Sequence, residues 1–170
     1  GKSLCFQAPA LVEAPRAAVV GGTTDSARRR GFALVVSPLI SLMKDQVDGL
    51  RVDGVDAAYL NSTLGAGERE AVMQSLREDR CRLLYVSPER LVGEGSQGFR
   101  RFLAQCGPRF VAIDEAHCIS QWGHDFRPAY LGLGEAVNAA KKPPVLALTA
   151  TAPPKVKDDI LAQLQIPEAS

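Results

Sequence analysis

The sequence predicts a doubly wound α/β domain, in which a mostly parallel sheet carries helices on both faces. Short apolar runs typical of strands alternate with stretches whose apolar residues recur at helical spacing. Three of the runs are continuous rather than alternating, which is typical of strands buried on both faces of a parallel sheet. A length of 170 residues fits one domain with a substantial core.

The strands are expected where β-type apolar residues are bounded by polar or turn residues. In chain order they are Ala33–Ser37, Ala57–Leu60, Arg82–Ser87, Phe110–Asp114 and Val145–Thr149.

Helices are expected between these strands. Leu4–Leu11 is apolar enough for one, although Pro9 is expected to shorten it, and the Pro-Pro start of Pro154–Leu164 suits a first helical turn. Apolar residues recur at helical spacing in three sets: Leu39, Met43, Val47 and Leu50; Val72, Met73 and Leu76; and Val156, Ile160 and Leu164.

Composition narrows the class of protein. The net charge of +1 neither indicates nor excludes a nucleic-acid partner, so a binding site for one must be local. No apolar run reaches membrane-spanning length and no signal segment opens the chain. The start without Met suggests a fragment, a processed chain or an incomplete gene model. The four scattered cysteines contain no C-x-x-C pair, which argues against structural zinc and favours reduced, mostly buried thiols in an intracellular protein.

One segment interrupts the alternation of strands and helices. Glu13–Gly31 is rich in Gly, Thr, Ser and Arg, and is predicted to be an exposed loop or insertion. Its run Arg28-Arg29-Arg30 could touch phosphates, but a solvated loop is favoured.

Polar motifs directly follow four of the predicted strands. Ligands of open α/β sheets bind at the carboxyl ends of the strands, so a functional rim is expected there. The motifs are Ser37-Pro38, Ser87-Pro88-Glu89-Arg90, Asp114-Glu115 and Thr149-Ala150-Thr151.

Gly1-Lys2-Ser3 matches the end of the phosphate-binding motif G-x-x-x-x-G-K-S/T. In that motif the Lys neutralises phosphate charge and the hydroxyl binds Mg²⁺. Three residues are a weak signal alone. Asp114 and Glu115 strengthen it, because adjacent carboxylates after a buried strand suit Mg²⁺–nucleotide chemistry: the first can hold the metal and the second can activate water. Solvated acids in a turn are the alternative.

The remaining motifs leave two interpretations open. Thr149 and Thr151 can bond to the acidic motif and sense the nucleotide, or form a strand-terminal turn. The stretch Cys118–Tyr130 is irregular and holds the only Trp of the chain. Its aromatic side chains can stack on bases, and Arg127 can pair with a phosphate or a carboxylate. Alternatively, Trp122 and Phe126 only anchor a loop to the core. The Ser-Pro turns can bind nucleic-acid phosphates or cap helices.

Together these motifs resemble the superfamily 2 helicases and, within them, the RecQ family. The matching stretches occur in family order and span nearly the whole chain, and the run DEAHCISQWGHDFRP is highly specific. They are Gly1–Leu11, Val35–Val47, Leu60–Leu64, Leu83–Leu91, Asp114–Pro128 and Ala147–Ala152.

The resemblance implies a RecA-like P-loop NTPase domain, the N-terminal ATP-binding domain of a 3′–5′ DNA helicase, spanning residues 1–170. It implies ATP and Mg²⁺ as cofactors, and Asp114, Glu115 and His117 as catalytic residues, with Ser3 and Asp114 on the metal. Gly1, Lys2, Ser3, Thr149 and Thr151 would bind or sense nucleotide. The expected DNA-binding or coupling residues are Gln121, Trp122, His124, Phe126 and Arg127, with Ser37, Lys44, Asn61, Ser87 and Arg90 as weaker candidates.

The implied partners are single-stranded and branched DNA and a second RecA-like domain of the same parent chain, with no membrane. The expected setting is DNA repair and recombination, in a bacterial cytoplasm at the nucleoid or in a nucleus. The phosphate loop lacks its first glycine here, and the second motor domain with its arginine finger is absent, so the chain alone is expected to be inactive as a helicase. An inert binding domain and a superfamily 2 RNA helicase are the alternatives.

Overall fold

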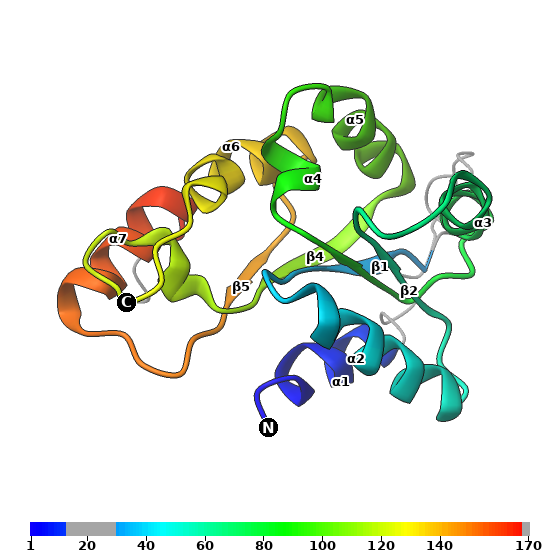
Figure 1. Ribbon diagram of the computed structural model, residues 1–170, viewed down its shortest axis with the longest axis horizontal. Coiled ribbons are helices and arrows are strands. Elements are labelled where there is room, and N and C mark those ends of the chain that lie inside the picture. Colours follow the sequence, from blue (N-terminus) through cyan, green and yellow to red (C-terminus); the bar gives the residue numbers. More distant parts are fainter. Residues whose placement is uncertain (13–29, 168–170) are drawn as a thin grey trace, which may run out of the picture.

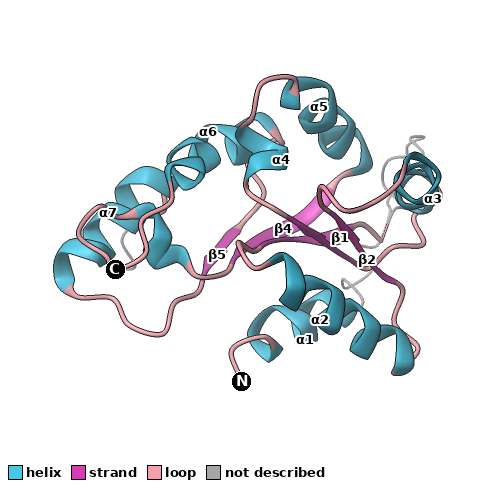
Figure 2. Cartoon of the chain, viewed as in Figure 1, coloured by secondary structure: helices cyan, strands magenta, loops and turns pink. Residues whose placement is uncertain are grey.

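The computed structural model describes residues 1–12 and 30–167. Its centre is a five-stranded sheet in the order β2-β3-β1-β4-β5, and every neighbouring pair is parallel (Figures 1 and 2). The predicted fold class is therefore confirmed. The strands are β1 Phe32–Val36, β2 Ala57–Leu60, β3 Leu83–Val86, β4 Pro108–Ile113 and β5 Val145–Ala147.

Helices cover both faces of the sheet. Along β1, Ala33 and Val35 face one apolar cluster, whereas Leu34 and Val36 face the other. All five β1 residues are buried, because side chains that alternate between faces meet helices on either side. This arrangement explains why the strand sequences are continuous apolar runs.

The two faces carry different sets of helices (Figure 1). On one face lie α1 (Leu4–Leu11) and α2 (Ile40–Val52), and on the other lie α3 to α7 with two 3₁₀ turns. That second set is α3 Ala66–Arg77, α4 Glu89–Val92, α5 Ser96–Cys106, η2 Ala116–Ile119, η3 Pro128–Gly132, α6 Leu133–Ala139 and α7 Pro154–Leu164.

The four predicted helices are present, with two corrections. Pro9 does not shorten α1, which continues to Leu11. It needs only to forgo the bond to the carbonyl of Cys5, which lies one turn back. Leu39 does not share the buried face of α2, because it precedes the helix as its N-cap in extended conformation and is 41% exposed.

Two other sequence predictions concern the loop and the thiols. Of the predicted loop Glu13–Gly31, residues 13–29 lie outside the described residues. All four cysteines are free; Cys81, Cys106 and Cys118 are buried and Cys5 is exposed. Within the described part of the chain, no helix has the length and apolar character needed to cross a membrane.

Candidate nucleotide and nucleic-acid site

The polar motifs meet at one edge of the sheet, as predicted. The strands are parallel, so their carboxyl ends share that edge. Backbone bonds hold the ends together: Ser37 N donates to Val86 O at 3.1 Å, and Asp114 N donates to Val36 O at 2.9 Å. On the other side of β4, Ala116 N donates to Leu148 O at 2.9 Å. This ladder brings the acidic motif beside the turn that follows β5.

Asp114 and Glu115 lie in different surroundings. Asp114 is buried, and its Oδ1 accepts the N–H of Glu115 at 3.0 Å. Burial raises the pKa of the Asp114 carboxyl, helped by the charge of Glu115 and opposed by Lys2 and His117. A buried carboxylate that is costly to ionise is well placed to take a bound cation, which would supply the missing charge.

Glu115 adopts the left-handed backbone conformation, with φ 50° and ψ 44°. Such geometry is uncommon for a residue with a Cβ and is concentrated at functional sites. It turns the carboxylate between two cationic or polar partners. Glu115 Oε1 lies 3.5 Å from Lys2 Nζ, and Oε2 lies 3.3 Å from His117 Nδ1. The fold therefore joins the Gly1–Ser3 motif to the acidic motif across 113 positions of sequence.

His117 connects the acidic motif to the turn after β5. Its Nδ1 lies 2.9 Å from Thr149 Oγ1, and that hydroxyl donates to the carbonyl of Thr151 at 3.1 Å. A hydroxyl has one proton, so Thr149 must accept from His117 and Nδ1 must carry the hydrogen. The predicted bond between the threonine turn and the acidic motif is present. The hydroxyl of Thr149 makes it, while Thr151 takes part through its carbonyl.

A buried tyrosine binds the backbone of the acidic motif from within the core. Tyr130 Oη donates to the carbonyl of Asp114 at 2.9 Å, inside the core. The residue follows the specific sequence run by only two positions, but nothing in its spacing indicated this contact. The sequence did not predict this bond, because it depends on how η3 packs in the core.

The segment between η2 and η3, residues 120–127, is named the aromatic loop. Trp122 is 70% exposed, which excludes the interpretation that it pins the loop to the core; Phe126 is half-buried. The ring of His124 stacks on His117 with centroids 4.8 Å apart. Gln121 is exposed. The loop thus touches the acidic motif through His124 and offers an open indole to solvent.

Arg127 points back into the loop. Its Nη2 lies 3.5 Å from Asp125 Oδ2, and its buried Nε has no partner within the described structure. The loop backbone is closed by Arg127 N, which donates to Cys118 O at 2.8 Å. The guanidinium has therefore kept donor capacity for a further acceptor.

Three potential metal ligands lie together where the aromatic loop meets η2. Ligand atoms of His117, Cys118 and Asp125 all lie within 4.8 Å of one another. Burial raises the pKa of the Cys118 thiol to about 11, so the sulfur keeps its proton and donates to Asp125 Oδ2 at 3.7 Å. The absence of a structural zinc site remains a prediction for this group.

A family model described as DEAD/DEAH box helicase matches residues 1–160. The chain belongs to this helicase family. Its motifs, predicted from sequence to resemble the superfamily 2 helicases, are the ones assembled at the rim.

Several curated relatives of this helicase domain carry RecQ names. "ATP-dependent DNA helicase RecQ" of Pasteurella multocida is 46% identical over 98% of the chain and 23% of the relative. The protein of that name from Bacillus subtilis is 48% identical over 98% of the chain and 25% of the relative. "ATP-dependent DNA helicase Q-like 2" of Arabidopsis thaliana is 43% identical over 99% of the chain and 22% of the relative. The RecQ resemblance is confirmed, and the chain spans about a quarter of the length of these relatives.

Solved helicase structures share the fold at low identity. The DUF1998 helicase MrfA, bound to DNA and AMPPNP, matches with a TM-score of 0.64 and 17% identity, over 95% of this chain and 22% of that one. A hypothetical ATP-dependent RNA helicase from Sulfolobus tokodaii matches with a TM-score of 0.56 and 18% identity, over 81% of this chain and 39% of that one. The matches support a RecA-like domain.

The weaker candidate residues of the helicase domain have local partners. The buried Ser37 Oγ accepts the N–H of Leu39 at 3.5 Å, and the buried Asn61 Oδ1 accepts the N–H of Thr63 at 2.9 Å. Both are local bonds to the residue two positions later, and neither caps a helix, since Leu39 is the N-cap of α2 and has no side-chain cap bond. The other three differ from one another: Ser87 is buried, the exposed Lys44 pairs with Asp48 at 2.5 Å, and Arg90 stacks on Phe99 at 4.8 Å.

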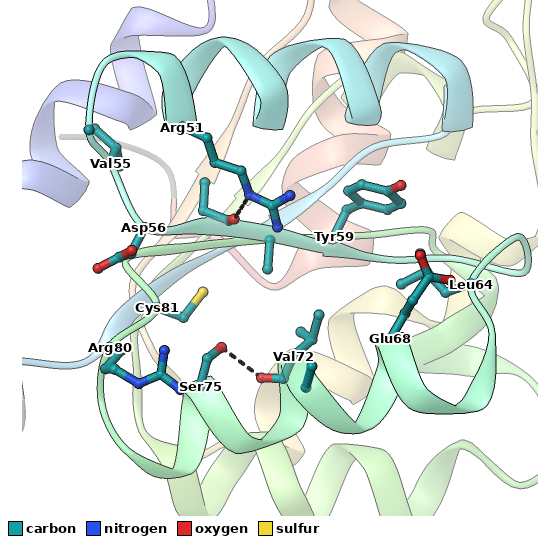
Figure 3. Close-up of a pocket in the computed structure, with 14 residues that line it drawn as sticks. Arg51, Val55, Asp56, Tyr59, Leu64, Glu68, Val72, Ser75, Arg80 and Cys81 are labelled. Carbon is teal, nitrogen blue, oxygen red and sulfur yellow. Dashed lines mark hydrogen bonds between the residues drawn. The ribbon is translucent and has the colours of Figure 1, made fainter.

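A hollow of about 550 Å³ lies away from this rim, beside the edge strand β2 and between α2 and α3 (Figure 3). Its walls explain how the sheet edge is protected. Arg51 Nε donates to the outward-facing carbonyl of Ala57 at 2.8 Å, so an added strand would meet an occupied acceptor. On the opposite wall Ser75 Oγ donates to Val72 O at 2.8 Å within α3. Of the stretches that match the helicase family, only Leu60–Leu64 reaches the hollow, through Leu64.

Proposed function

We propose that this chain is the first motor domain of a RecQ-type, ATP-dependent DNA helicase that moves 3′ to 5′ along single-stranded DNA. One observation carries the proposal: an unbroken series of contacts runs from Lys2 through Glu115 and His117 to His124 of the aromatic loop. These contacts would connect phosphate chemistry at Lys2 to base stacking at the aromatic loop. The names of the relatives support ATP and DNA as its ligands.

The Gly1–Ser3 motif would hold the nucleotide phosphates. Gly1 and Lys2 precede α1, and the ammonium of Lys2 would pair with the phosphates. Carboxylate and hydroxyl oxygens are the ligands that Mg²⁺ prefers, so Asp114 and Ser3 fit that ion. When bound, Mg²⁺ would neutralise charge that develops on the phosphates.

Glu115 would act as the general base. Its carboxylate, held by Lys2 and His117, would accept the proton of the attacking water. Thr149 and His117 would then report the state of the nucleotide to the aromatic loop, with Thr151 holding the Thr149 hydroxyl in place.

The aromatic loop would contact DNA through the residues expected from sequence. Trp122 would stack on a base, and Gln121, His124, Phe126 and Arg127 would complete the contact. Ser37, Lys44, Asn61, Ser87 and Arg90 would lie along the strand's path. The proposed partners are single-stranded and branched DNA, in repair or recombination, and the proposed location is the bacterial cytoplasm or a nucleus.

A second motor domain would complete the enzyme. An arginine supplied from outside is worth roughly 10³–10⁵ in rate in related NTPases. We therefore propose that this domain hydrolyses ATP poorly by itself and unwinds no DNA.

Strand displacement by the full-length protein tests the proposal. With ATP and Mg²⁺, a duplex with a 3′ single-stranded DNA tail is expected to unwind, and one with a 5′ tail is not. Unwinding of the 5′-tailed duplex alone would contradict the direction. Preference for an RNA tail would favour an RNA helicase, and no unwinding of any substrate would favour an inert binding domain.

A further inference from the structure

The exposed Trp122 is tied to α7 by two separate contacts. Asp159 on α7 accepts a hydrogen bond from Ser120 Oγ at 2.6 Å, and Ser120 Oγ in turn accepts the N–H of Trp122 at 3.1 Å. One helical turn earlier, Lys155 Nζ lies 4.3 Å from the centroid of the indole ring. Ser120 is only 1% exposed, so the first link is buried while the ring it positions is not.

We propose that α7 positions the aromatic loop: Asp159 fixes the backbone at Trp122 through Ser120, and Lys155 covers one face of the indole and leaves the other for a base. The proposal rests on the proposed function, because it assigns the residues that present Trp122 to DNA. Asp159 and Lys155 are positioning residues, and Trp122 makes the contact.

The Ser120 hydroxyl is the centre of the link. It donates its one proton to a carboxylate and accepts an amide N–H, so both ends of the link are satisfied. A bond to an ionised acceptor is stronger than one between neutral groups. The link therefore holds the loop backbone at the residue that precedes the exposed ring by two positions.

Lys155 restricts how the ring can be used. An ammonium is attracted to the electron-rich face of an indole, and this contact fixes the ring plane. A planar ring has two faces, and with 70% of Trp122 exposed the second face is open. Base stacking needs one such face.

The position of α7 in the chain gives the contact a second consequence. The helix begins at Pro154, three positions after the end of the Thr149–Thr151 turn that binds His117. Two prolines at the junction limit the backbone freedom between turn and helix. A movement of the threonine turn would therefore move Asp159 and Lys155, and with them Trp122.

The single tryptophan of this chain makes the test specific, because intrinsic fluorescence reports position 122 alone. In the 170-residue chain without DNA, Asp159→Ala and Ser120→Ala are expected to lower the fluorescence anisotropy of Trp122. Asp159→Asn keeps an acceptor and is expected to stay near wild type. Asp158→Ala, an exposed neighbour on α7, is the matched control.

Quenching by acrylamide tests Lys155. Lys155→Ala uncovers a second ring face and is expected to raise the quenching constant by up to about twofold. Lys155→Met restores a long apolar stem over the ring and is expected to remain near wild type. Equal anisotropy in wild type, Asp159→Ala and Ser120→Ala, or an unchanged quenching constant in Lys155→Ala, would overturn the proposal.

Two further measurements keep the result interpretable. Far-UV circular dichroism checks the fold, and if Asp159→Ala unfolds then Ser120→Ala, which removes a single oxygen, decides the anisotropy test. Single-stranded DNA is then titrated against Trp122 emission in wild type, where quenching is expected. Absence of quenching would contradict the DNA-binding role of the loop, while the anisotropy result would still decide whether α7 positions it.

Discussion

The imidazole of His117 lies 2.9 Å from the hydroxyl of Thr149, and this contact joins the ends of β4 and β5. The same nitrogen lies 3.3 Å from Glu115, so one imidazole N–H faces both the proposed base and the proposed sensor. A change in the charge of Glu115 or in the position of Thr149 must alter this shared interaction. If the proposed function holds, His117 couples the two ends of the rim.

Thr149→Val removes this hydroxyl while preserving side-chain shape. Loss of a hydrogen bond of about 1–1.5 kcal/mol is expected to reduce DNA-stimulated ATP hydrolysis by about tenfold in the full-length protein. Thr151→Val is the control, because Thr151 contributes its carbonyl to the network and valine keeps it. A double-mutant cycle with His117→Ala should show strong non-additivity. Additive losses would mean that the two residues act separately.

Asp114→Asn is expected to raise the melting temperature at pH 7. Burial raises the pKa of Asp114, so its charged form carries a cost in the folded state that a neutral amide avoids. The gain should be full above the folded pKa and disappear as the pH falls toward the ordinary value of about 3.9, where the carboxyl is protonated in both states. Thermal unfolding across pH measures it, with the exposed Asp158→Asn as control. A gain that persists at low pH would contradict the charge explanation.

Tyr130→Phe is expected to cost about 1–3 kcal/mol of unfolding free energy, because it leaves the buried carbonyl of Asp114 without its donor. Denaturant unfolding measures the loss. Tyr59→Phe is the matched change, since the hydroxyl of the half-buried Tyr59 makes no hydrogen bond within the described residues, and it should be close to neutral. Equal effects of the two changes would show that the Tyr130 bond contributes little.

Gly134→Ala tests the packing of α6 against α7. A Cβ at Gly134 would lie 2.0 Å from the carbonyl oxygen of Gln163, so the helices must separate. The expected cost is about 1–3 kcal/mol or more, typical of overpacking. Gly98→Ala, in α5 with open space around it, is expected to stabilise by about 0.5–1 kcal/mol. A neutral Gly134→Ala would mean that α7 shifts at little cost.

The sequence predicted the sheet well because its pattern depends on burial from two sides. Short apolar runs, three of them continuous, located all five strands, and the strand ends located the rim. The α5 helix escaped prediction although Phe99, Phe102, Leu103 and Cys106 recur at helical spacing, which is the signal that would have found it. The short α4 and the 3₁₀ turns contain too few residues to show a helical repeat of apolar side chains.

Within the site, sequence predicted the residues and the fold supplied their partners. Lys2, Glu115 and His117 were each expected to act, but the contact between Lys2 and Glu115 joins segments 113 positions apart. Asp159 had no local signal, since its partner Ser120 lies 39 residues away. The left-handed backbone conformation of Glu115 could not be predicted either, because glutamate rarely adopts a positive φ.

ATP hydrolysis by the full-length protein, with and without single-stranded DNA, tests the central claim most directly. Hydrolysis by the wild type should be strongly stimulated by DNA. Glu115→Gln should lower the rate by about 10²–10⁴-fold, as expected for loss of a general base. Trp122→Ala should lose most of the stimulation by DNA. Hydrolysis that is absent from the wild type, or that ignores DNA in wild type and Trp122→Ala alike, would contradict the account of a DNA-coupled motor.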